Sequence, residues 1–273
     1  MLPVFGIAPL CEKEKVRLNM KSKIHFMDEE TKVIFTDPKN TEAIYRYIPL
    51  KHLDKNSLYF ANPETWPDPF EKLFLKSKYK IDKKQVPYKY ENSIFCMCVT
   101  TTKYSEATWK VYGSEVQFKI SKELFLSILE ANTDKYDIYI GKVEYRNSSD
   151  LLRNSPLTLL GLEKKDFQIP EGWIRLLLQK RNDFKYENEI RIILIKKGLS
   201  EKKSKKGIQI VYNEDITSLF PKAIISPTLS AAETESVKKE LEKYFFSPEN
   251  IHVNKLYKEV EPRNINLDYV RKK

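Results

Sequence analysis

The sequence contains only seven glycines, and their spacing excludes two common phosphate-binding loops. They lie at positions 6, 113, 141, 161, 172, 198 and 207, so neither GxGxxG nor GxxxxGK[ST] occurs anywhere in the 273 residues. Both motifs need closely spaced glycines, because the backbone must approach the phosphate groups without an intervening Cβ atom. Rossmann and P-loop chemistry by those routes is therefore excluded.

Cysteine and histidine are also scarce, with three residues of each. Cys11, Cys96 and Cys98 form an odd set that is typical of a reducing compartment, so we expect a cytoplasmic protein without a disulfide framework. No histidine has a partner at a zinc-type spacing, so no metal site is predicted. Cys96 and Cys98 fall on one face of a predicted strand, and we interpret them as buried structural residues.

Long apolar runs are missing as well. The opening MLPVFGIAPL lacks a basic leader and a small-residue cleavage site, and no later run reaches membrane-spanning length. We therefore expect neither a signal peptide nor a membrane partner. Positive charge, in contrast, is abundant, since 48 Lys and Arg against 38 Asp and Glu give a formal net charge of +10. This charge favours an anionic partner such as nucleic acid or a phosphate-bearing ligand.

The order of the predicted elements indicates an α+β protein. Residues 1–40 have a weak, mixed pattern and are interpreted as an N-terminal extension that packs on the main domain or on a partner. Residues 41–273 are interpreted as a single α+β domain of catalytic type. Strands are predicted at AIYRYI, SLYFA, SIFCMCV, EVQFKI, DIYIGKVEYR, YENEIRIILI, IQIVY and KAIISP. Helices are predicted at ATWKVY, KELFLSILEA and AAETESVKKELEKYFF. We expect IQIVY to return antiparallel to YENEIRIILI as a long-looped hairpin.

The segment KYENEIRII places two acids and a base on one face of a predicted strand. These are Glu187, Glu189 and Arg191, with Ile190 and Ile192 on the other face. If the charged face lines a cleft, one carboxylate can stabilise a developing cation or polarise a ribose hydroxyl, while the other charges fix its position. The alternative is a half-exposed strand that simply turns its charges toward solvent.

A second candidate is Arg46, which lies between two tyrosines in the apolar strand IYRYIP. A buried guanidinium is costly unless it is paired, and its planar fork suits a phosphate or a carboxylate such as that of Glu189. A role in ligand binding and a purely architectural ion pair are both compatible with this pattern.

The loop NPETWPDPFE offers polar and aromatic groups at the end of a predicted strand. It contains Asn62, Asp68 and Phe70, and two prolines fix the chain around Asp68. Such a loop can form the wall of a nucleotide pocket, although Asp68 can equally cap a helix that starts near Phe70. Trp109 and Tyr112, three apart on a predicted helix, are either core residues or rings that stack on a base.

A lysine-rich segment follows the acidic strand. Lys202, Lys203, Lys205 and Lys206 lie in the predicted loop between YENEIRIILI and IQIVY. Phosphate contacts need only basic side chains near the reacting site, so we interpret these lysines as nucleic-acid-binding residues. The alternative is a solvated loop tip.

Several of these motifs together resemble the prokaryotic domain-of-unknown-function family 2971. They are IYRYIPL, LYFANPETWPDPFE, SIFCMCVTT, TWKVYGSEVQFKI, GKVEYR and KYENEIRII, which follow the order of that family's motifs from about Tyr45 to Ile195. Pro67 stands where the family usually has Asn, and Phe184 stands where it usually has Trp. More remotely, the layout is similar to that of ADP-ribosyltransferases of the DarT-like kind, which modify nucleic acid.

The second resemblance implies an ADP-ribosyltransferase-like central mixed or antiparallel sheet with flanking helices, and NAD⁺ as co-substrate without a metal. The residues expected to bind NAD⁺ are Arg46, Tyr47, Asn62, Asp68, Phe70, Trp109, Tyr112 and Arg191. Glu189, with Glu187 as the alternative, is expected to stabilise the ribose cation as nicotinamide leaves.

The same resemblance implies an RNA or DNA acceptor and a cytoplasmic toxin or phage-defence effector, for which an antitoxin or regulatory protein is a further partner to consider. Two alternatives stay open. One is a non-catalytic module that binds nucleic acid or a nucleotide, and the other is an NAD⁺ glycohydrolase.

Overall fold

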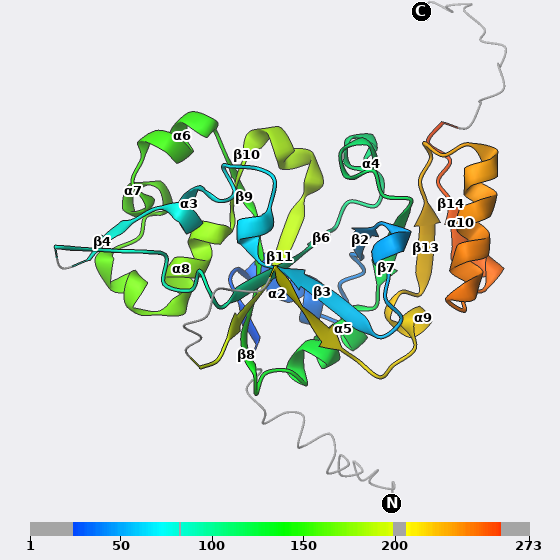
Figure 1. Ribbon diagram of the computed structural model, residues 1–273, viewed down its shortest axis with the longest axis horizontal. Helices are drawn as coiled ribbons and strands as arrows, with labels where there is room; N and C mark the ends of the chain where they lie inside the picture. Colours follow the sequence, from blue (N-terminus) through cyan, green and yellow to red (C-terminus); the bar gives the residue numbers. More distant parts are fainter. Residues whose placement is uncertain (1–23, 82, 199–205, 258–273) are drawn as a thin grey trace, which may run out of the picture.

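A ten-stranded mixed sheet runs through the part of the chain that this computed structural model describes, residues 24–81, 83–198 and 206–257 (Figure 1). Its strands are β1 (Ile24–Phe26), β2 (Ile44–Ile48), β3 (Ser57–Ala61), β6 (Ile94–Thr100), β7 (Val116–Ile120), β8 (Tyr136–Lys142), β11 (Glu189–Lys196), β12 (Gly207–Val211), β13 (Lys222–Ile225) and β14 (Ile251–Val253). The pairs β1–β8 and β13–β14 are parallel, and the other pairs are antiparallel. The predicted α+β class is therefore confirmed.

The sheet divides at β6. The strand order is β1-β8-β11-β6-β2-β7-β13-β14, and β6 also pairs with β3, which in turn pairs with β12. β6 meets β3 at the pair Cys96 and Ala61, whereas it meets β2 at the pair Thr100 and Tyr45. Between these two pairs, residues 97–99 of β6 face a gap between the diverging strands β2 and β3. We refer to this gap as the fork.

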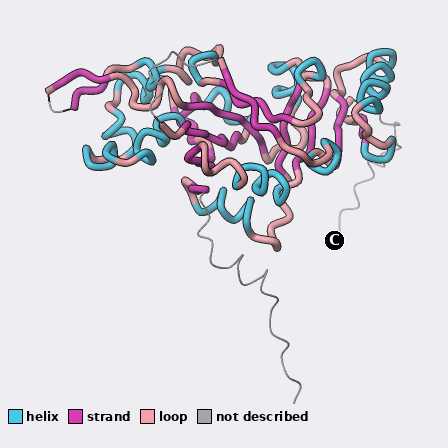
Figure 2. The backbone as a smooth tube through the Cα atoms, turned by 60° about the horizontal axis from the view of Figure 1, so that its bottom comes forward, coloured by secondary structure: helices cyan, strands magenta, loops and turns pink. Residues whose placement is uncertain are grey.

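Helices flank the strands on both sides (Figure 2). The α-helices are α2 (Glu29–Thr36), α3 (Leu73–Lys76), α4 (Glu106–Tyr112), α5 (Lys122–Glu130), α6 (Ser148–Arg153), α7 (Pro156–Leu160), α8 (Pro170–Leu177), α9 (Ile216–Leu219) and α10 (Ala231–Lys243). The 3₁₀ helices are η1 (Leu50–His52), η2 (Pro63–Thr65), η3 (Lys164–Gln168), η4 (Asn182–Glu187) and η5 (Pro248–Asn250). Two further sheets pair β4 (Tyr79–Ile81) with β5 (Lys84–Val86), and β9 (Glu144–Arg146) with β10 (Gln179–Arg181).

Within the described ranges, no helix is both long and apolar enough to span a bilayer.

The alternation of β6 divides the core in two. Phe95, Met97 and Val99 face the larger hydrophobic cluster, which includes α2, α5, α9 and α10. Ile94 and Cys96 face the second cluster, built with α3, α6 and α8. Cys96 is a buried free thiol, as predicted, while Cys98 is only partly buried because it lies at the fork.

Of the extension expected over residues 1–40, the structure describes residues 24–40, in which β1 pairs with β8 and α2 buries Ile34 and Phe35 in the larger cluster. The hairpin expected between β11 and β12 is wrong, since β12 pairs with β3 instead. β11 has no free edge for β12, because β6 and β8 occupy its two sides.

Candidate functional site

A cavity of about 550 Å³ lies in the fork. Its walls come from β2, β3, β6 and α4, from the loop after β3, and from the segment that joins β10 to β11. This volume suits a small-molecule ligand. The predicted site residues that line the cavity are Arg46, Tyr47, Asp68, Tyr112, Glu187 and Glu189. The fold thus gathers at one place residues that are distant in the sequence.

Lys180 is the centre of a buried ion cluster at the wall of this cavity. Its Nζ lies 2.8 Å from Glu71 Oε1, 2.5 Å from Glu187 Oε2 and 2.9 Å from Glu189 Oε2. Less than a tenth of each of these four side chains is exposed. Three carboxylates therefore share one ammonium group away from bulk water.

Arg191 supplies the second positive charge of the cluster. Its Nε lies 2.7 Å from Glu189 Oε1, and its Nη2 lies 2.8 Å from Glu71 Oε1. Nη1 donates to the carbonyl oxygen of Leu177 at 2.5 Å, and the guanidinium lies 4.4 Å from the ring centroid of Trp66. Arg191 is fully buried and is not among the cavity-lining residues, so its direct partners are the carboxylates that it positions.

A left-handed residue brings the two cavity-lining acids together. The prediction that Glu187 lies on the strand is wrong, because Glu187 ends the 3₁₀ helix η4. Asn188 then has φ of 44° and ψ of 55°, and Glu189 begins β11. Asparagine tolerates this backbone conformation better than most residues, and its side-chain amide donates to Thr101 Oγ1. The carboxylates therefore reach Lys180 from two different elements.

Glu187 and Glu189 ionise differently. Burial raises the pKa of Glu187 to about 7, and this outweighs the opposing effect of Lys180. Burial acts in the same direction on Glu189, but Arg191 and Lys180 together hold the pKa of that carboxyl well below its ordinary value. Pairs of acids with separated pKa values are typical of sites that move protons near neutral pH. The environment thus favours the ionised form of Glu189 and the protonated form of Glu187.

The two acids also differ in their hydrogen bonds. Glu189 accepts from Arg191 through both oxygens, at 2.7 and 3.3 Å, and from Lys180 through Oε2. Glu187 accepts through Oε2 from Lys180 at 2.5 Å. The Tyr112 side chain is a further hydrogen-bonding neighbour of Glu187. The structure therefore holds Glu189 between two cations, which suits a fixed charge, whereas Glu187 pairs with one cation only.

Arg46 connects β2 and β3, the two strands that diverge at the fork. Its Nη2 donates to the carbonyl oxygen of Tyr59 at 3.2 Å, which links β2 to β3. Its Nη1 is buried and has no hydrogen-bond partner within the described residues, and burial lowers the pKa of Arg46 to about 10. The expected carboxylate partner, Glu189, is paired with Arg191 and Lys180 instead. An anionic group bound in the cavity would satisfy the free Nη1.

Tyr47 and Tyr112 form an aromatic wall. Their ring centroids are 6.0 Å apart with an interplanar angle of 21°. Trp109 contacts Tyr47 edge-on at 4.7 Å, is only 2% exposed and is not among the cavity-lining residues. Trp109 is therefore a core residue that supports Tyr47, whereas Tyr112, 46% exposed, is available to a ligand.

The loop after β3 contributes one predicted residue to the cavity. Asp68 lines it, accepts from the Phe70 backbone N–H at 3.0 Å and accepts from Arg181 at 3.2 Å. The helix expected to start near Phe70 begins instead at Leu73, with Lys72 as its N-cap, so Asp68 stabilises a turn and is not a helix cap. Phe70 lies beneath the Arg181 guanidinium, 4.6 Å from it, and outside the cavity lining. Asn62 is buried and accepts from the backbone N–H of Glu64 at 2.8 Å, which gives it a structural role in the loop.

Lys180 was not among the predicted site residues, although the sequence carries a signal for it. It lies two residues after the apolar run LLL at residues 176–178, whose members are buried. A lysine next to such a run is rarely buried without an anionic partner. One of its three acidic partners, Glu71, comes from the loop after β3, and no periodicity in the sequence connects positions 71 and 180.

The predicted nucleic-acid-binding lysines fall largely outside the described residues, where Lys202, Lys203 and Lys205 lie. Lys206 is exposed, and its carbonyl oxygen accepts from the Asn62 backbone N–H at 2.9 Å. This contact places Lys206 where β12 begins, beside the end of β3, which is one arm of the fork.

The three acids of the site pair with two cations of the protein, Lys180 and Arg191. Across residues 24–81, 83–198 and 206–257, no group of three or more His, Cys, Asp or Glu side chains is arranged to hold a metal ion. The site therefore places four groups around one cavity: an acid with a lowered pKa, an acid whose pKa is raised to about 7, a guanidinium nitrogen without a partner among the described residues, and an accessible aromatic ring. Comparison of the chain with models of protein families, with curated proteins and with solved structures gives no match.

Proposed function

We propose that the cavity in the fork binds NAD⁺ and that the protein is an ADP-ribosyltransferase acting on a nucleic acid. The observation that carries the proposal is the acid pair Glu187 and Glu189, which line one cavity with opposite tendencies to ionise. The free Nη1 of Arg46 in the same cavity, the mixed sheet with flanking helices and the resemblance to DarT-like enzymes support it.

The proposed reaction assigns a separate task to each group. Arg46 binds the pyrophosphate through Nη1, and Tyr112 stacks on a ring of the dinucleotide. The bond between the ribose and nicotinamide breaks, nicotinamide leaves with the electron pair, and the negative charge of Glu189 stabilises the resulting ribose cation. The acceptor then forms a bond to the ribose and gives its proton to Glu187. With water as the acceptor, the same steps give NAD⁺ hydrolysis.

The energetic cost of the ion cluster favours an enzyme over a simple binding module. Burying three carboxylates and two cations is often no more stabilising than packing apolar side chains of similar volume. A module that only binds a ligand does not need two acids with separated pKa values, whereas proton transfer and cation stabilisation do. The cluster also ties β10 and η4 to β11, so a purely architectural role is the competing interpretation.

Incubation with NAD⁺ labelled on its adenylate phosphate, together with RNA, DNA and a protein extract, tests the proposal. Label transferred to nucleic acid supports it. Label transferred only to protein, release of nicotinamide without transfer, or binding without turnover each overturns it in favour of a protein-modifying enzyme, a glycohydrolase or a binding module. Glu189→Gln should lose the transfer activity. Its matched control is Glu144→Gln, because Glu144 is an exposed acid that pairs with Arg146 away from the cavity.

A further inference from the structure

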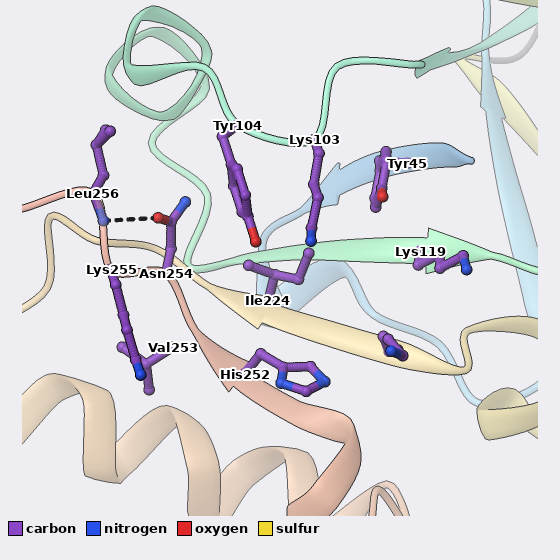
Figure 3. A pocket seen from close by; sticks show the side chains of 11 residues that line it. Tyr45, Lys103, Tyr104, Lys119, Ile224, His252, Val253, Asn254, Lys255 and Leu256 are labelled. Carbon is purple, nitrogen blue, oxygen red and sulfur yellow. Dashed lines mark hydrogen bonds between the residues drawn. The ribbon is translucent and has the colours of Figure 1, made fainter. Parts of the chain in front are cut away.

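A second cavity, of about 540 Å³, has a strongly basic lining (Figure 3). Its charged side chains include Lys103, Lys119, Lys222 and Lys255, and no Asp or Glu lines it. Within the described part of the chain, other lysines form ion pairs, but none of these four does. The cavity therefore has unneutralised positive charge.

The register of the sheet connects this basic cavity to the acid pair. From β11 to β13, the directly paired residues are Glu189, Thr100, Tyr45, Lys119 and Lys222. Paired residues on neighbouring strands share a face, so these five side chains form one row across five strands. With about 4.8 Å between strands, Lys119 lies about 14 Å from Glu189 along this row. Tyr45 lines both cavities, which makes them neighbours.

The pairing of Lys119 with Lys222 is unfavourable for the fold alone. The two residues are direct partners on antiparallel strands, and like charges at such positions destabilise a sheet. No described acid forms an ion pair with either. A bound anion between the two ammonium groups would remove the repulsion.

Asn254 adds an unsatisfied donor to the same cavity. Only 9% of the residue is exposed, and its Oδ1 accepts from the Leu256 backbone N–H at 3.0 Å. Its Nδ2 has no hydrogen-bond partner within the described residues. A buried amide N–H without a partner is costly, and a phosphate oxygen is a suitable acceptor for it.

An exposed aromatic ring accompanies the lysines. Tyr104 is 51% exposed, and Lys103 Nζ lies 4.7 Å from its ring centroid. Figure 3 shows both side chains reaching from the loop before α4 toward Ile224, above the strands that carry Lys119 and His252. A basic groove with an accessible aromatic ring is the usual arrangement for binding single-stranded nucleic acid, because lysines contact phosphates and rings stack on bases.

We infer that this basic cavity binds the phosphate backbone of a single-stranded nucleic acid. A nucleic acid bound there can continue along the row of side chains through Tyr45 to the cavity in the fork, where the nucleotide to be modified would contact Glu187. The binding itself stands on the basic cavity alone, while its role as the acceptor site rests on the proposed function.

Fluorescence anisotropy with short labelled single-stranded RNA and DNA, at several salt concentrations and without NAD⁺, tests this inference. For the double variant Lys119→Gln and Lys222→Gln, we expect at least tenfold weaker binding and a slope of log K against log salt lowered by about 1.4, from about 0.7 per lost phosphate contact. The control is the double variant Lys32→Gln and Lys165→Gln, which removes the same charge from exposed positions elsewhere.

The outcomes separate this inference from the proposed function. Identical slopes for the wild type and the Lys119/Lys222 variant overturn it, as does an equal loss in the Lys32/Lys165 control, which would show dependence on net charge alone. A larger effect from replacing Lys202, Lys203, Lys205 and Lys206 with Gln would move the site to that segment. The binding measurement needs no NAD⁺, so nucleic-acid binding by the wild type without ADP-ribosyl transfer overturns only the proposed function.

Discussion

Lys180 Nζ and Glu189 Oε2 lie 2.9 Å apart with both side chains at least nine-tenths buried, and this contact joins β10 to the first residue of β11. Lys180 also pairs with Glu71 and Glu187, so a single ammonium group contacts three acids. The stability of this region and the protonation of the cavity wall therefore depend on the same residue.

Replacing Lys180 with Met should destabilise the protein by about 3–5 kcal/mol at pH 8, because it leaves buried carboxylates without their partner. The acids would respond with raised pKa values in the folded state. An acid whose pKa is raised in the folded state contributes stability below its unfolded pKa of about 4.3, and this contribution is lost as pH rises through the folded pKa. The destabilisation caused by Lys180→Met should therefore be smaller at pH 5 than at pH 8. Urea unfolding of the variant and the wild type at both pH values measures the difference in the free energy of unfolding.

The control for this change is Lys142→Met, because Lys142 pairs with Glu30 at a partly exposed site. A surface ion pair contributes at most about 1 kcal/mol. A Lys180→Met protein that unfolds like this control at pH 8 would show that the buried cluster contributes little to folding.

The pH dependence of the transfer reaction should report the raised pKa of Glu187, about 7. If Glu187 accepts the proton of the acceptor, kcat/KM rises with pH up to about 7 and then levels off, since the base must be ionised. Glu187→Gln should remove this limb and reduce the rate by about 10²–10⁴-fold. A rate that falls as pH rises through 7 would instead make Glu187 the general acid.

Glu189→Gln should lower kcat by about 10²–10³-fold while NAD⁺ binding persists, because the amide keeps the shape of the side chain but not its charge. Removing this anion should also lower the pKa of Glu187, which Glu189 helps to raise. The shift is measured by ¹³C NMR of labelled glutamate side chains. A folded Glu189→Gln protein with unchanged kcat would transfer the electrostatic role to Glu187 or end the enzyme interpretation.

Arg46→Lys should weaken NAD⁺ binding by about 10–100-fold, because one ammonium group cannot both contact the Tyr59 carbonyl and bind a phosphate as the guanidinium does. Isothermal titration calorimetry measures the affinity, and Arg153→Lys, at an exposed position on α6, is the matched control. Unchanged affinity together with a lower Tm would show that Arg46 serves only to bridge β2 and β3.

The sequence predicts most of the local structure because local signals control it. The alternation of IYRYI, IFCMCVT and VQFKI corresponds to β2, β6 and β7. Ser105 caps α4, and Gly113 ends that helix with φ of 56°, a backbone conformation that glycine adopts without strain. These features depend on side-chain periodicity and backbone preference within a few residues.

Strand pairing and charge pairing were decided by the tertiary structure. Backbone hydrogen-bonding groups are the same in every strand, so the sequence of β12 does not distinguish β11 from β3. β12 pairs with β3 because the edges of β11 are already occupied. The left-handed backbone at Asn188 likewise lies outside the alternation on which the strand prediction depended, so Glu187 reaches the cavity from η4.

By itself, then, the sequence determined the α+β class, the positions of most elements, the net charge of +10 and the candidates Arg46, Glu187 and Glu189. Only the tertiary structure brought Lys180 and Glu71 to those acids and separated their pKa values, because burial and charge at short range depend on distance in space. For the same reason, only the register of five strands placed the row from Glu189 to Lys222 on one face of the sheet.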